Sequence, residues 1–321
     1  MKKYLTYFIK ISVTLGLLFY VFKNYLNIDD LKLVLNEVKL YWIWPLIGIH
    51  FLFRILQALQ MHFCFLYYNF KIKVLNILRI QFVSTFFTFF LPGDIIAGGI
   101  TWHMLSKNLE GKMEIASIVL YLKLLNLATL IPFGVIGVVS ENSLTSAGIH
   151  YYLIIISFIL IIFIVPFMWY RAALILQKIA DYFLKYSIIK PLKNTVYDLI
   201  NAIFKCSDMA LANKIIIILM SFFINIISII WLFLAAQMSG IEMPALSNLW
   251  LLPLLTLIHA LPVTLNGTGL REFTLITVLN EFYSVKSEKT IILSLIIFFI
   301  GILCGFIGGI LMLFNNRKQL N

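Results

Sequence analysis

The sequence predicts an all-α membrane protein that crosses the bilayer several times, and three observations carry this prediction. Of the 321 residues, 62% are hydrophobic and only 12% are charged, about half the charged share of soluble domains. The apolar residues form long continuous runs, which favour helices over the short alternating strands of an outer-membrane barrel. Lys and Arg gather between alternate runs, as the positive-inside rule expects of a multi-pass protein.

Six apolar runs are long enough to cross a bilayer as helices, and they cover residues 5–22, 42–66, 115–139, 151–170, 214–236 and 290–314. Two more apolar stretches, 78–104 and 249–283, are interrupted by Pro and Gly. The N-terminal run has no small-residue cleavage site and is followed by further spans. We therefore expect a retained first helix, not a signal peptide.

The basic residues predict sidedness and reveal two hairpins. Seventeen of the 25 Lys and Arg residues fall in segments that this order of spans places on one side, and five fall on the other. The larger group predicts a cytoplasmic side that includes both termini. Stretch 78–104 then lies between two inside segments and 249–283 between two outside segments, so we expect two re-entrant helical hairpins. Three basic residues, Arg54, Lys123 and Arg271, remain at membrane depth.

The two halves of the chain predict an inverted repeat. Each half reads span, span, hairpin, span, the first starting inside and the second outside, and such repeats are typical of transporters. LPGDIIAGG (Leu91–Gly99) and LPVTLNGTG (Leu261–Gly269) also share a Leu-Pro start and a Gly seven residues after the Pro. The predicted single membrane domain of residues 1–321 divides into a first repeat (1–139), a connecting region with an amphipathic cytoplasmic linker (140–213, whose span 151–170 belongs to the second repeat), the remainder of the second repeat (214–316) and a tail (317–321).

The second hairpin has the strongest pattern for a binding site. Pro and Gly break its helix at membrane depth, where freed backbone groups must line a cavity or be buried in protein. A half-helix starting near Gly269 offers N–H donors to an anion, and Arg271 adds a permanent charge that Glu272 can balance. The alternative is a buried Arg–Glu pair that only locks the hairpin. The other predicted substrate-binding residues here are His259, Asn266 and Gly267.

The first hairpin and the spans contribute further polar groups. In the hairpin, Asp94 could cap the second half-helix and His103 could contact a lipid headgroup, beside Gly98 and Gly99. The alternative is a capped hairpin with a Trp–His pair at the membrane interface. Two polar stripes, one in each half, suggest an internal groove or plain interhelical hydrogen bonding, and they consist of His50, Arg54 and Gln57 and of Ser221, Asn225 and Ser228.

Two more features lie in the later spans. Lys123 and Asn126 form an intramembrane polar pair one helical turn apart, although Lys123 could instead extend to the cytoplasmic surface. In the last span Gly301, Gly305 and Gly309 form a close-packing face of the small-residue kind. This face could also mediate a homodimer.

The stretch LPVTLNGTGLRE resembles the flippase-like transmembrane family, which comprises the membrane region of lysylphosphatidylglycerol synthases and stand-alone relatives, some linked to polyprenyl-phosphate glycan pathways. The matching positions are Pro262, Gly267, Gly269, Arg271 and Glu272, and the resemblance extends over nearly the whole chain. It implies that this hairpin handles an anionic lipid. The first hairpin departs from the family pattern, because Trp102 and His103 stand where the family commonly has Arg, and Asp94 precedes the glycines.

Together these observations predict a flippase that moves an anionic lipid between leaflets of a bacterial plasma membrane. Arg271, the half-helix start at Gly269, Arg54 and Lys123 would neutralise the headgroup while the tails stay in lipid. We expect no enzyme activity, cofactor, metal or nucleic-acid partner, since the sequence has no P-loop and no Cys/His cluster, and the hairpins offer only the isolated carboxylates Asp94 and Glu272. The alternatives are a membrane-embedded transferase of lipid-linked substrates and a secondary transporter of a small solute.

Overall fold

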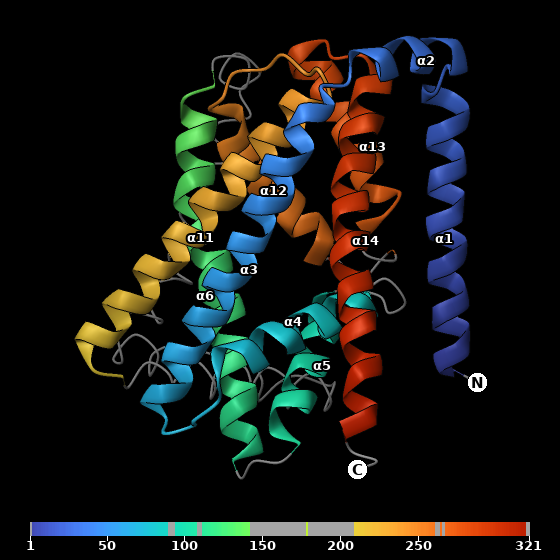
Figure 1. The fold of residues 1–321 in the computed structure, drawn as a ribbon. Helices are drawn as coiled ribbons and strands as arrows, with labels where there is room; N and C mark the ends of the chain where they lie inside the picture. Colours follow the sequence, from blue (N-terminus) through green and yellow to red (C-terminus); the bar gives the residue numbers. More distant parts are fainter. Residues whose placement is uncertain are drawn as a thin grey trace.

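The computed structural model describes residues 2–88, 94–107, 111–141, 178, 209–260, 264 and 267–318. Within these ranges all regular structure is helical, which confirms the predicted all-α class (Figure 1). The helices are α1 (Lys2–Tyr25), α2 (Ile28–Glu37), a 3₁₀ turn η1 (Leu40–Trp42), α3 (Ile43–Tyr67), α4 (Val74–Thr88), α5 (Asp94–Ser106), α6 (Lys112–Val139), α11 (Leu211–Met238), α12 (Ser247–Ala260), α13 (Leu270–Tyr283) and α14 (Ser287–Lys318). The predicted span 151–170 and most of the linker lie outside the described residues.

Four helices are long and apolar enough to cross a membrane, and they match four of the predicted spans. They are Leu40–Tyr67, Lys112–Val139, Leu211–Met238 and Ser287–Leu313. The chain is therefore a multi-pass membrane protein, with four candidate spans in its described part instead of the six predicted for the whole.

The first predicted span has a more complex shape than the sequence suggested. Ile11–Tyr25 and Ile28–Glu37 pass the length and hydropathy test only as a pair bent by 88°, which would give a fifth span. Helix α1 ends at Tyr25, and Asn27 caps α2, because its side chain accepts a hydrogen bond from the Asp29 backbone N–H at 3.0 Å. An N-cap of this kind fixes the start of the new helix.

Two helix pairs occupy the stretches predicted as hairpins. We call α4 and α5 the first hairpin, and α12 and α13 the second hairpin. Each helix has 13 to 15 residues, fewer than the roughly 20 that a full crossing needs. In Figure 1 the first hairpin lies in the lower part of the bundle and the second in the upper part, while α14 extends over its full height. Length and position agree with re-entrant hairpins, which stay a prediction.

Each hairpin packs against the last span of the other half of the chain, α4 on α14 and α12 on α6. Glycines allow both close approaches. A Cβ at Gly137 of α6 would lie 2.7 Å from the backbone N of Trp250, and one at Gly309 of α14 would lie 3.1 Å from the Phe86 ring. Gly309, the last residue of the predicted close-packing face of α14, thus contacts α4 of the same chain, and a homodimer through this face stays a prediction.

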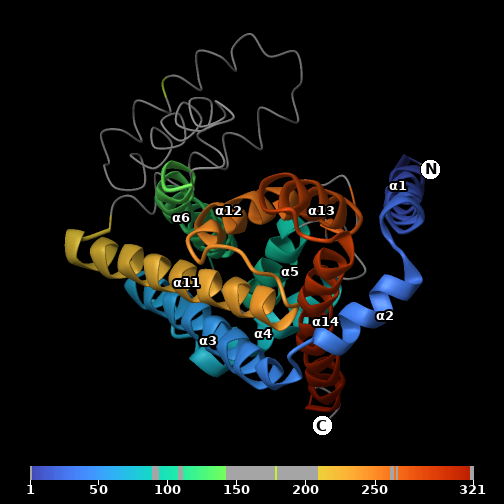
Figure 2. The same ribbon diagram turned by 90° about the horizontal axis from the view of Figure 1, so that it is seen from above.

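Two buried apolar clusters hold the two hairpins separately. One cluster includes Leu251 of α12 and Leu275 of α13, and the other includes Ile77 of α4 and Leu105 of α5. Helices α3 and α11 pack against each other and contribute to both clusters, as Figure 2 shows from above. Both hairpins therefore pack with α3 and α11, but each lies in its own apolar cluster.

The segments predicted to be cytoplasmic gather at one end of the molecule. Both termini, the end of α3, the end of α5 and the starts of α6 and α11 lie in the lower part of Figure 1. Helix α2, the end of α6 and the end of α13 lie at the opposite end. We call the end with the termini the lower end, and its exposure to the cytoplasm stays a prediction.

Candidate functional site

The charged pair of the second hairpin is buried and closed on itself. Arg271 and Glu272 are 2% and 6% exposed, and Arg271 Nη2 lies 2.6 Å from Glu272 Oε1. Ser294 of α14 completes the network, because its hydroxyl accepts from Arg271 Nε at 2.9 Å and donates to Glu272 Oε1. This geometry is the predicted alternative, in which the pair locks the hairpin to a neighbouring span.

The start of α13, predicted to bind an anion, already faces a carboxylate of the same chain. The Gly269 N–H donates to Glu272 Oε2, so Glu272 supplies the negative charge that a helix N-terminus favours. Gly269 has φ +87°, and a Cβ there would lie 2.8 Å from Leu17 Cβ of α1. Helix α1 therefore packs directly against the start of α13.

Other predicted residues of the second hairpin also serve local packing. Gly267 has φ +72° and lies against the ring of His259, since a Cβ there would be 3.1 Å from His259 Cδ2. His259 Nδ1 lies 2.7 Å from the Leu255 carbonyl oxygen one turn earlier. Asn266 lies outside the described residues.

The first hairpin differs, because its basic neighbours are exposed. Lys123 of α6 is exposed, and its Nζ would lie 3.3 Å from a Cβ at Gly98. His103 is exposed on α5, while Asp94 is the first residue of that helix. Gly98 thus leaves room for the lysine side chain to lie along the hairpin.

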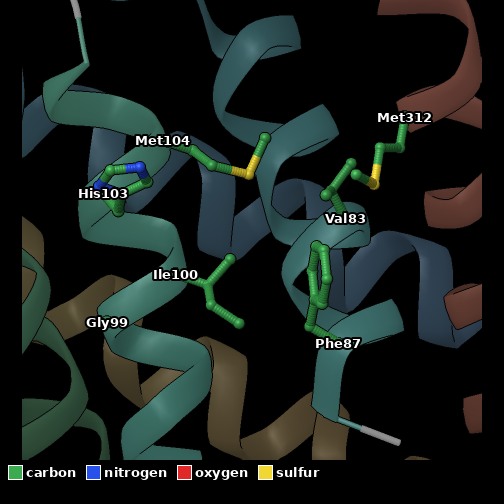
Figure 3. A pocket seen from close by; sticks show the side chains of 7 residues that line it. All are labelled: Val83, Phe87, Gly99, Ile100, His103, Met104 and Met312. Atoms are coloured by element: carbon green, nitrogen blue, oxygen red, sulfur yellow. The ribbon is translucent and has the colours of Figure 1, made fainter. Parts of the chain in front are cut away.

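An apolar cavity of about 500 Å³ opens beside this hairpin, between α4, α5 and α14. Figure 3 shows side chains of α4 and α5 facing one another across the opening, with Met312 of α14 at one side. His103 is the one titratable group in its lining, which consists of Val83, Phe87, Gly99, Ile100, His103, Met104 and Met312. Gly99 and His103, one turn apart on α5, thus line the same hydrophobic space, and their role in binding a substrate stays a prediction.

The Ser/Asn stripe of α11 takes part in interhelical hydrogen bonds. Gln60 of α3 donates to the hydroxyl of Ser221 and to the Ile217 carbonyl, the latter at 3.1 Å. Asn225 donates to Thr129 Oγ1 of α6 at 3.0 Å. Sequence analysis missed Gln60, although it stands three residues after Gln57 and continues that polar stripe. The network links α3, α6 and α11, which fits plain interhelical bonding.

Arg54 does not join Arg271 in one cluster. Arg54 lies close enough to Cys304 of α14 to act on it electrostatically, whereas Arg271 contacts Ser294 of the same helix. Ten residues of α-helix correspond to about 15 Å. The two arginines thus meet α14 at different levels, and Lys123 lies by Gly98 instead.

A second buried carboxylate, that of Glu141, was not among the site residues predicted from the sequence. Glu141, 8% exposed and two residues after the end of α6, accepts hydrogen bonds from Ser247 Oγ at 2.8 Å and from Tyr283 Oη at 2.7 Å. Tyr283 also accepts from Trp250 Nε1 at 3.3 Å. The cluster ties both outer ends of the second hairpin to α6.

The comparisons with known proteins agree with the resemblance. Residues 7–309 match the family described as "Lysylphosphatidylglycerol synthase TM region". No curated protein and no solved structure matches the chain. Among the described residues no three His, Cys, Asp or Glu side chains group in a way that could hold a metal ion.

Proposed function

Because this chain belongs to the family of the lysylphosphatidylglycerol synthase transmembrane region, we propose that it moves an anionic lipid between the leaflets of a bacterial plasma membrane. The substrate would be an isoprenoid phosphate carrier, a glycolipid built on one, or a phospholipid. The excess of basic residues at the lower end supports cytoplasmic termini. The chain is thus a lipid transporter in this proposal and not an enzyme.

One observation carries the proposal. On α5, Gly98 lies against the exposed cation Lys123, and the next residue, Gly99, lines an apolar cavity. A charged and a hydrocarbon-compatible surface therefore adjoin on the same short helix. An amphipathic anion, with a phosphate and a chain, complements both surfaces, whereas a small soluble solute complements only the first.

The second hairpin would act in a different step. Glu272 neutralises Arg271, so a phosphate can reach the guanidinium only by displacing that carboxylate. We propose that Lys123 receives the headgroup before Arg271 does, and that Arg271 exchanges Glu272 for the phosphate when one half rocks against the other. The crossed packing of α4 on α14 and α12 on α6 supports this step, because movement of one half shifts both hairpins.

Reconstitution tests the proposal. Purified protein in liposomes would be given fluorescent phosphatidylglycerol or a fluorescent isoprenoid monophosphate, and an impermeant quencher would report the outward movement of the probe. We expect Lys123→Gln and Arg271→Ala to slow translocation by roughly tenfold, as loss of about 1.4 kcal/mol of charge stabilisation would. The matched control is Lys32→Gln, because Lys32 is exposed on α2 and pairs only with exposed Asp29 in the described structure.

The outcomes separate the alternatives. Translocation that is unchanged in a well-folded Arg271→Ala variant contradicts the role of the second hairpin. Translocation absent from the wild type with both probes contradicts the function itself. Mass spectrometry of lipid that co-purifies with the wild type identifies the substrate class, and release of a modified lipid headgroup in the same assay would favour the transferase.

A further inference from the structure

The polarity of the lining changes along the cavity beside the first hairpin. Helix α4 presents Val83 and Phe87, one turn apart, and α5 presents Gly99 and His103, also one turn apart. Because α5 runs toward the lower end, His103 lies nearer that end than Gly99 does. Phe87, at the end of α4, lies nearer the hairpin tip. The cavity is therefore apolar at depth and polar only toward the lower end.

Basic residues continue both lining faces beyond the cavity. Arg79 precedes Val83 by four residues and so stands on the same face of α4, one turn nearer the start of that helix. Its Nη2 donates to the Leu311 carbonyl at 2.9 Å, beside Met312 of the lining. Lys107 follows His103 by four residues and is exposed. Arg79 and Lys107 thus each stand four residues from a lining residue of α4 or α5, and His103 lies in the lining itself, which is otherwise apolar.

We propose that this cavity binds one hydrocarbon chain of an anionic lipid from the leaflet at the lower end, with its phosphate held by Arg79, His103 and Lys107. The argument rests on charge complementarity, because a membrane lipid has the same order, an anionic group at the surface and a chain below it. A volume of about 500 Å³ lies within the range of small-molecule sites. This inference deepens the proposed function by naming where the substrate is first held and which end of it is recognised.

Gly99 offers a way to fill the cavity without disturbing the fold. A Cβ at Gly99 has no atom within 4 Å, so a larger side chain there enters the open space. Gly99→Leu should therefore block the chain site. Gly48 of α3 is the matched control, because it is also helical and exposed, has no atom within 4 Å of a Cβ, and does not line the cavity.

The test is native mass spectrometry of the purified full chain with dioleoyl phosphatidylglycerol and with dioleoyl phosphatidylcholine. We expect the wild type to prefer the anionic lipid, Gly99→Leu to weaken its binding at least tenfold, and Gly48→Leu to leave it unchanged. Arg79→Gln keeps a donor for the Leu311 carbonyl but should remove the preference for the anionic lipid. Equal binding of both lipids by the wild type, or wild-type affinity in Gly99→Leu, would overturn the proposal.

The same variants distinguish failure of this site from failure of the proposed function. If Gly99→Leu loses binding but the wild type translocates neither fluorescent probe, the chain site stands and the transport proposal falls. If Gly99→Leu binds and translocates like the wild type, transport stands and the chain site is wrong.

Discussion

The two hairpins hold their charges in opposite ways. In the second hairpin Arg271 and Glu272 are buried and bonded to each other and to Ser294. In the first hairpin the neighbouring cation Lys123 and the imidazole of His103 are exposed. The difference teaches that a basic residue at membrane depth has two separate uses. Arg271, buried beside its acid, fastens α13 to α14, whereas the exposed side chain of Lys123 can be reached by an anion from outside the protein.

The helices of the first hairpin are joined by weaker polar contacts. Thr101 of α5 donates to Ser84 of α4 at 3.0 Å, and both side chains are buried. A neutral hydrogen bond contributes about 1 kcal/mol, less than a bond to a charged group. This contact between α4 and α5 is thus neutral, whereas α13 is bound to α14 by a charged network.

The largest predicted effect comes from breaking the buried pair. Glu272→Gln leaves Arg271 with a buried charge that no carboxylate balances, while the amide oxygen can still accept from the Gly269 N–H. Removing one partner of a buried ion pair costs about 3–5 kcal/mol. We expect a correspondingly large fall in the free energy of unfolding, measured by thermal or denaturant unfolding in detergent.

The double variant Arg271→Leu with Glu272→Gln is the control for that experiment. It removes both charges, so most of the lost stability should return if an unbalanced charge is the cause. A Glu272→Gln protein as stable as the wild type would show that the second hairpin is not held by this pair.

Two glycines, one in each hairpin, should respond to the same substitution with opposite sign. Gly269→Ala places a Cβ 2.8 Å from Leu17 at φ +87°, which should cost about 1–3 kcal/mol. Gly99→Ala meets no atom within 4 Å in a helix and should gain about 0.5–1 kcal/mol. Unfolding curves of both variants check the signs, and a destabilised Gly99→Ala would mean that the cavity is not open.

Much of the fold followed from the sequence, because apolar length and charge distribution act locally. The spans at α3, α6, α11 and α14 and both hairpin stretches were predicted within a few residues. The site was harder. Arg271 and Glu272 are adjacent in sequence, so their pairing could be foreseen as an alternative, whereas Ser294 and the Glu141–Tyr283 contact depend on tertiary packing that no local pattern records.

A smaller effect tests the polar contact within the first hairpin. Thr101→Val keeps the side-chain shape but removes the donor to Ser84, so the free energy of unfolding should fall by about 1 kcal/mol. The measurement is the same unfolding assay, with Thr277→Val as control, because Thr277 is exposed and its hydroxyl donates to the Phe273 carbonyl within α13. A loss as large as that of Glu272→Gln would erase the proposed difference between the hairpins.

The smallest effect concerns a partly exposed ion pair between α2 and α14. Lys289 of α14 lies 2.8 Å from Glu37 of α2, whose side chain is 57% exposed. The hydrogen bond and charge of Lys289 lower the pKa of Glu37 below its ordinary value of 4.5. Because the folded-state pKa is the lower one, the contact stabilises the protein above about pH 4.5 and is lost as the pH falls through the folded value.

Lys289→Gln should therefore lower the Tm slightly at neutral pH and not at all at low pH, where Glu37 is protonated in both proteins. Thermal unfolding of the two proteins across this pH range measures the difference. A pH-independent difference would assign the effect to the second bond of Lys289, which it donates to the Gly240 carbonyl at 3.0 Å. Water screens the exposed pair, so its effect should stay far below that of Glu272→Gln, because burial makes the loss of one charge costly.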